Sequence, residues 1–316
     1  MKTINQIICI VLILACNPML FAQKTIKEYV TKNNTEKIKK SIIIDALSKP
    51  ATHKSFKDGH GKTPYLSSIK QLPDTLALIT FHIIDVEGVS KFSWWNETGQ
   101  LTEQQGNLIA NKINKQTIVS LKEAFKERGA VLLTPEEFLD TEKKRNFYYN
   151  SFAPEVSKVG TFLNNIENIN TDISVCANNY RYFDMGAAAD YKRSESLGNN
   201  LAKELGVDGL LSVSVGFYSD SKGAYTNMIK MAIHGPNPNP KVDKKYVGQK
   251  NGTGYYEGQL YFAGKFTFKK PIKTIEVDYK KKKTDNINFE GTEVIFSSFI
   301  EKYYDEMNKA IDKVSK

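Results

Sequence analysis

The chain has 316 residues, 41% of them hydrophobic, with a formal net charge of +9. This is ample chain for a buried core, and three cysteines are too few for a disulfide scaffold, so packing must supply the stability. The positive balance favours anionic neighbours, but the basic residues are spread among acidic ones. The only dense run, 280–283, has no interleaved aromatic residues, which argues against nucleic-acid binding.

The first predicted element is a secretory signal peptide over residues 1–22. Lys2 gives a positive start, residues 7–15 form an uninterrupted apolar run, and Ala22 is the small residue before Gln23. An apolar run of this length is shorter than the ~20 residues that cross a bilayer. We therefore expect export to the periplasm or the cell surface.

Two processing routes are open for this signal. Cleavage after Ala22 resembles the signal ends of exported proteins of Bacteroidota and releases a soluble chain. The segment Ile13-Leu14-Ala15-Cys16 is similar to a lipobox, with Cys16 as the lipidated residue. Because the stretch after Cys16 is more apolar than a lipoprotein tether, we expect cleavage after Ala22.

The first half of the mature chain shows helical and strand patterns in turn. Apolar spacing predicts a helix over 25–47, interrupted at Asn33-Asn34, and then a polar loop to residue 73. The apolar run 76–86 predicts a central strand covered on both faces. A capping box at Thr102 begins a long helix that we expect to end at Gly129. A short strand and a helix starting at Thr134-Pro135 follow.

The second half is predicted to be mostly strands after one helix, with no clear pattern over 148–185. The predicted elements are a helix over 189–205 stopped by Gly206, strands over 209–218 and 225–234, two or three strands within 255–268 and 272–279, and a helix over 294–314. This order predicts an α/β (α+β) fold: a mixed, partly antiparallel sheet with helices packed on it and a long C-terminal helix. We expect an N-terminal helix and polar loop over 23–73 and a single mixed α/β domain over 74–316.

Two segments carry a family resemblance. They are Lys126-Glu127-Arg128-Gly129-Ala130-Val131-Leu132-Leu133-Thr134-Pro135-Glu136-Glu137-Phe138 and Leu201-Ala202-Lys203-Glu204-Leu205-Gly206-Val207-Asp208-Gly209-Leu210-Leu211-Ser212-Val213-Ser214-Val215. This arrangement resembles the α/β domain of envelope proteins related to the curli-export lipoprotein and to the N-terminal domain of the Tol–Pal propeller protein. The match covers about half of the mature chain, and 147–188 is an insertion relative to the family pattern. The resemblance implies an envelope assembly or accessory role without catalysis.

Motifs for catalysis, metals and cofactors are incomplete in this sequence. Gly61-Lys62-Thr63 ends like a phosphate loop, but Phe56 stands where its first glycine belongs. A lone Cys176 in an apolar stretch is typical of a small buried hydrophobic residue, and Glu136-Glu137 suits the first turn of a helix. The histidines lack metal-ligand spacing; they are His53, His60, His82 and His234. We expect no enzyme activity, no metal and no cofactor.

Three positions are candidates for contact or modification. Trp94 and Trp95 follow the predicted central strand, where such rings stack on sugars or contact a partner. The alternative is a hydrophobic staple that packs on the start of the next helix. Asp74-Thr75-Leu76 is similar to the O-glycan acceptor of Bacteroidota, with Thr75 as the modified residue.

The predicted function is that of an exported, non-catalytic cell-envelope protein with an assembly, accessory or binding role. Its expected partner is an envelope protein or an anionic envelope component (a glycan, lipopolysaccharide or peptidoglycan), not nucleic acid, and homo-oligomerisation is left open. The alternatives are a lipid-anchored outer-membrane structural lipoprotein and an exported hydrolase without a recognisable motif. A cleft that gathers two carboxylates or a His–carboxylate pair would mark the hydrolase.

Overall fold

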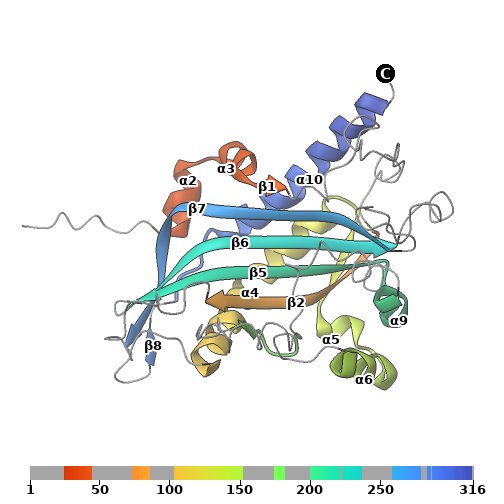
Figure 1. Cartoon of the computed structure of the whole chain (residues 1–316), viewed down its shortest axis with the longest axis horizontal. Helices are drawn as coiled ribbons and strands as arrows, with labels where there is room; N and C mark the ends of the chain where they lie inside the picture. The colour runs from red at the N-terminus through yellow and green to blue at the C-terminus, as the bar shows by residue number, and fades with distance from the viewer. Residues whose placement is uncertain are drawn as a thin grey trace, which may run out of the picture.

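The computed structural model describes residues 25–44, 73–85, 103–151, 174–181, 200–220, 223–236, 258–278, 283–285 and 287–314 (Figure 1). The helices are α2 (Ile26–Lys32), α3 (Thr35–Ser41), α4 (Glu103–Lys126), α5 (Pro135–Phe138), α6 (Glu142–Ser151), α9 (Ala202–Leu205) and α10 (Thr292–Val314). The strands are β1 (Ile43–Ile44), β2 (Thr75–Asp85), β3 (Val131–Leu133), β4 (Ser174–Cys176), β5 (Gly209–Asp220), β6 (Gly223–Pro236), β7 (Gly258–Asp278) and β8 (Lys283–Asp285).

The strands form one mixed sheet with the order β1-β7-β6-β5-β2-β3, in which β4 also pairs with β2 and β8 with β7. Strand β2 runs parallel to β3 and β5, and every other pairing is antiparallel. The predicted mixed, partly antiparallel sheet is therefore confirmed. So is the central place of β2, with β5 directly beside it.

Helices cover the two faces of the sheet unequally. On the first face, α2, α3, α4 and α10 pack into one large core cluster with side chains from β2, β5, β6 and β7. On the second face, α5, α6 and α9 form a smaller cluster over the start of β2 and β5, around Ala77, Ile79 and Leu210. Figure 1 shows α5, α6 and α9 gathered near one end of the sheet. The start of β2 is thus covered on both sides, as its apolar run predicts.

Glycines end α4 and α9 where the sequence predicts. Gly129 has φ +79°, and the bonds Ala130 N–H to Phe125 O (3.1 Å) and Gly129 N–H to Lys126 O (3.0 Å) close a Schellman motif. Gly206 has φ +67° and closes the same motif after α9. A residue with a β-carbon pays a steric cost in this left-handed region, which explains glycine at both ends.

The N-terminal helix is broken as predicted but ends earlier. Asn34 caps α3, since its Oδ1 accepts the Lys37 N–H at 3.1 Å, so α2 and α3 are separate helices. Residues 43–44 leave the helix and pair with β7 as β1, so the prediction of helix there was wrong. We call residues 25–44 the N-terminal arm.

The arm is held by the C-terminal half of the chain. Lys39 Nζ forms ion pairs with Asp305 Oδ2 at 3.1 Å and Glu301 Oε2 at 3.6 Å, both on α10. The side chain of Ile38, which is fully buried, joins the first-face core. Packing against α10 and β7 therefore fixes the arm from the far end of the sequence.

One long strand, β7, replaces the two or three strands predicted within 255–268 and 272–279. Strand β7 continues through Pro271, because its register with β6 shifts between the pairs Met228–Thr267 and Thr226–Ile272. In that bulge the four β7 residues 268–271, Pro271 among them, lie opposite the single β6 residue Asn227. Proline has no backbone N–H, and it is tolerated in the bulge because no hydrogen bond between the strands is required at that position.

Candidate functional site

The predicted contact and modification residues fall at different places. Trp94, Trp95 and Cys16 lie outside the described residues. Thr75 is the half-buried first residue of β2, where its N–H donates to Asp208 Oδ2 (3.1 Å) and its carbonyl accepts the Asp208 N–H (2.9 Å). The turn before β5 is thereby fixed to the start of β2, which gives Asp208 a structural role.

A row of side chains, all but one of them polar or ionisable, crosses the second face of the sheet. Its members are successive cross-strand partners, one from each of six strands: Cys176 (β4), His82 (β2), Ser214 (β5), Lys230 (β6), Lys265 (β7) and Ile43 (β1). Directly opposed residues of neighbouring strands project from the same face. We call this set the polar row. Because its members are scattered from residue 43 to residue 265, only strand register brings them together.

The centre of the polar row is buried and neutral at His82. His82 is 2% exposed and Ser214 is 4% exposed, and Ser214 Oγ lies 3.5 Å from His82 Nδ1. Burial, and secondarily the positive charge of Lys230, lowers the pKa of His82 to about 3. The imidazole is therefore uncharged at neutral pH, and the sequence interpretation of His82 as a packed strand residue agrees with this environment.

The thiol at the end of the polar row is unreactive. Burial raises the pKa of Cys176 to about 12, opposed by the positive charge of Arg181. A thiol with this pKa is protonated at neutral pH and is a weak nucleophile. The long Ser214–His82 contact gives little activation of the hydroxyl either. No carboxylate stands in the polar row, so the His–carboxylate pair expected of the alternative hydrolase is not formed there.

Small side chains flank the polar row on one side: Thr80, Ser212, Ala232 and Ala263. The row on the other side contains Gly216, Met228 and Thr267. At Gly216 a β-carbon would lie 2.5 Å from Cγ of Met228, so glycine is required by close packing.

Positive charge is concentrated at the β6–β7 side of this face. Lys230 is half-buried, and the β7 residues Lys265, Thr267 and Lys269 are exposed at alternating positions. We call these four residues the basic face. Residues 258–275 of β7 contain four lysines and no acidic residue. Lys230 and Lys265 are direct cross-strand partners, an arrangement in which like charges repel.

A ladder of asparagines secures the strand that carries Cys176. Asn107 Nδ2 donates to the Cys176 carbonyl (2.9 Å), Asn111 Oδ1 accepts the Asn178 N–H (2.6 Å), and Asn114 Nδ2 donates to Tyr180 Oη (3.3 Å). The three ladder residues, 107, 111 and 114, lie on one side of α4. The sequence analysis did not predict this role, although three asparagines spaced along one side of an amphipathic helix indicate a shared contact.

Segment 174–181 is also held at its far end. Tyr148 Oη donates to the Ile79 carbonyl and accepts the Arg181 N–H at 2.8 Å. The Arg181 guanidinium lies 4.7 Å from the centre of the Tyr149 ring, a cation–π distance. This segment thus lies along the same edge of β2 as β3, further toward the end of the strand.

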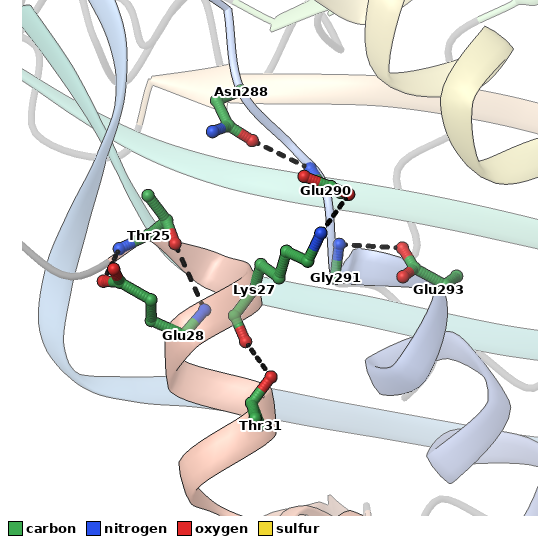
Figure 2. Close-up of polar contacts among 8 residues, drawn as sticks. All are labelled: Thr25, Lys27, Glu28, Thr31, Asn288, Glu290, Gly291 and Glu293. Carbon is green, nitrogen blue, oxygen red and sulfur yellow. Dashed lines mark hydrogen bonds and ion pairs between the residues drawn. The ribbon is translucent and has the colours of Figure 1, made fainter.

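A second feature is a groove of about 770 Å³ between α4 and the start of α10. It is lined by Gln116, Ser120, Ile287, Asn288, Phe289, Glu290 and Glu293. Figure 2 shows the contacts at its rim: Lys27 Nζ pairs with Glu290 Oε1 at 2.6 Å, and the Gly291 N–H donates to Glu293 Oε2 at 2.9 Å. Glu290 thereby joins α2 to the segment before α10, whereas Glu293 accepts a backbone hydrogen bond at the start of its own helix.

Within the described ranges, no three His, Cys, Asp or Glu side chains are grouped so as to hold a metal ion. In the same part of the chain, no helix combines the length and apolar character needed to cross a membrane. No family model, curated protein or solved structure matches this chain.

Proposed function

We propose that this protein is an exported, non-catalytic component of the cell envelope that binds an anionic envelope molecule. The observation that carries the proposal is the junction between the predicted signal and the fold. Thr25 is the N-cap of α2: its Oγ1 accepts the Glu28 N–H (3.1 Å), while the Glu28 carboxylate accepts the Thr25 N–H (3.0 Å). Removal of residues 1–22 therefore leaves the first capped helix intact.

The charge distribution supports the class of partner. The net charge is +9, and the positive charge is not evenly distributed over the surface, because the basic face carries exposed lysines on the sheet. A localised positive potential raises the local concentration of anionic molecules and speeds their association. The resemblance to the curli-export and Tol–Pal family supports an assembly or accessory role at the envelope.

Mass spectrometry of the mature N-terminus tests export directly. We expect a chain that starts at Gln23, free or cyclised, in the periplasmic or surface fraction. A diacylated Cys16 would replace the soluble form with the lipid-anchored alternative. A cytoplasmic chain that retains residues 1–22 would contradict the proposal. The same intact mass reports any glycan on Thr75.

Tryptophan fluorescence tests the second contact candidate. If Trp94 and Trp95 contact a partner, their emission is red-shifted and quenched by iodide, whereas packed staple rings are protected. A double alanine variant then keeps its melting temperature but loses retention on isolated envelope. Unchanged retention would assign the pair a purely structural role.

A further inference from the structure

We propose that the groove between α4 and the start of α10 is a binding site for an uncharged oligosaccharide of N-acetylated amino sugars. This inference goes beyond the proposed function, because the ligand is neutral and the site lies on the side of the sheet that α4 and α10 cover. The groove volume of about 770 Å³ is within the usual range of about 300–1,000 Å³ for small-molecule sites. Gln116, Asn288 and Glu290 at its rim are exposed, so part of a longer sugar chain has access to it.

One wall of the groove is a pair of polar residues on α4. Gln116 and Ser120 are four positions apart, so their side chains lie on the same side of the helix. In the described part of the chain, neither side chain has a hydrogen-bond partner. The neighbouring residues Thr117 and Leu121 are buried and hold this turn of the helix in place. The wall therefore presents an amide and a hydroxyl at fixed positions.

The opposite wall is the segment that leads into α10, and it is rigid. The Asn288 N–H donates to the Thr274 carbonyl of β7 at 2.8 Å, and the fully buried Phe289 packs edge-on against Phe217 with ring centres 5.7 Å apart. Figure 2 shows that Asn288 Oδ1 accepts the Glu290 N–H, at 3.1 Å. A site whose walls are fixed before binding loses little conformational entropy when the ligand arrives.

The polar groups of the groove match an acetamido sugar. Glu290 and Glu293 each use one carboxylate oxygen in the contacts of Figure 2, and the other oxygen can accept a hydrogen bond from a sugar hydroxyl. The side-chain amides of Gln116 and Asn288 can donate to an acetyl carbonyl, and the Gln116 carbonyl can accept the acetamido N–H. Ile287, which is half-buried in the lining, offers an apolar contact for the acetyl methyl group.

The charge of the groove disfavours ionic ligands of either sign. Its described lining includes two carboxylates and no basic side chain, which repels an anion. Lys27 pairs with Glu290 and neutralises one of these carboxylates, and the net charge of +9 repels a cationic polymer at long range. An uncharged ligand that carries both donors and acceptors avoids both penalties.

Isothermal titration of the purified mature protein, residues 23–316, with tetra-N-acetylchitotetraose tests the proposal. We expect saturable binding that is insensitive to added salt, because the ligand has no charge. Maltotetraose, which lacks the acetamido groups, should bind at least about tenfold more weakly.

A pair of matched variants locates the site. Gln116→Ala/Ser120→Ala removes two hydrogen-bonding groups and should raise the Kd at least about tenfold. The control Lys115→Ala/Val119→Ala changes the preceding pair on α4, with the same spacing, whose exposed side chains are not among the described lining residues. It should change the Kd less than about twofold.

Several results would overturn the inference. Absence of saturable binding up to about 10 mM sugar would reject it. Tighter, salt-sensitive binding of the deacetylated, cationic tetramer or of pentalysine would make the groove a site for cations instead. Equal losses in the test and control variants would place the sugar elsewhere on the protein.

Circular dichroism melting curves must show that each variant is folded, which alanine, a strong helix former, favours. If the double variant on α4 is unfolded, Asn288→Asp decides. It keeps the acceptor for the Glu290 N–H, removes the donor to the sugar, and should raise the Kd at least about fivefold. Because export is read from the mature N-terminus, the proposed function survives a failure here.

Discussion

His82 shows how a single buried titratable residue sets a pH dependence. It sits in β2, an interior strand of the sheet, where burial and the ammonium of Lys230 disfavour a charged imidazole more than a hydrogen bond with the Val213 backbone favours it. Its protonation is therefore suppressed in the folded state. In the unfolded chain the same imidazole titrates near its ordinary pKa of 6.5.

Acidification should destabilise the protein through His82. The folded pKa is depressed to about 3, so below pH 6.5 the unfolded state binds more protons than the folded state. Stability from this group is present above pH 6.5 and is lost as the pH falls toward 3. Between pH 7 and pH 5 the loss should be about 2 kcal/mol. Urea unfolding at both pH values should show this extra loss in the unmodified protein and not in His82→Gln; equal losses would contradict the assignment.

Cys176 should react slowly in the native protein. Its pKa is raised from 9.0 to about 12, which reduces the thiolate fraction at pH 8 about a thousandfold. Because a thiolate of higher pKa is intrinsically more nucleophilic, colour release from a thiol-reactive disulfide reagent should be about tenfold or more slower in native than in urea-unfolded protein. Cys176→Ser supplies the blank, and fast native labelling would show that the thiol is open to solvent.

At the level of secondary structure, the sequence predicted those features, such as helix ends, that depend on the type of residue at a single position. Gly129 and Gly206 end helices because no other residue enters the left-handed region so readily, and this is visible in one sequence. The bulge around Pro271 was missed because it depends on register against β6. The polar row was missed for the same reason: a side chain's neighbours across a sheet come from distant positions that sequence patterns do not connect.

Gly291 and Gly129 form a matched pair for a test of close packing. Both have positive φ, +101° and +79°, but a β-carbon at Gly291 would lie 2.8 Å from backbone atoms of Lys27, whereas Gly129 has no atom within 4 Å. Gly129→Ala should cost about 1 kcal/mol from strain alone. Gly291→Ala should cost about 3 kcal/mol, since α2 must also move. Urea unfolding gives both values; equal costs would mean that the junction of α2 and α10 adapts freely.

For the whole molecule, the two core clusters predict where charge is not tolerated. Leu211 is fully buried in the first-face cluster and Ile79 is 2% exposed in the second. An aspartate at either position is a buried, unpaired charge that costs about 3–5 kcal/mol, a large part of a typical total stability of about 5–15 kcal/mol.

We expect Leu211→Asp and Ile79→Asp to abolish cooperative unfolding or soluble expression. The control Val119→Asp changes a residue of α4 that is 65% exposed and should shift stability by less than about 0.5 kcal/mol. Soluble, cooperatively folded Leu211→Asp protein would mean that the first-face cluster is not the main core. The same result for Ile79→Asp would show that α5, α6 and α9 cover the second face only loosely.

The attachment of the N-terminal arm to α10 has a consequence for the timing of folding. Lys27 and Glu290 are separated by 263 positions, and Lys39 contacts α10 still further along the chain. Contacts of such high sequence separation form late, because loop closure is costly before other structure exists. If the chain is exported N-terminus first, as proposed, its arm stays undocked until almost the last residues have crossed the membrane. The topology would then separate export from folding in time and keep the polypeptide unfolded enough to be translocated.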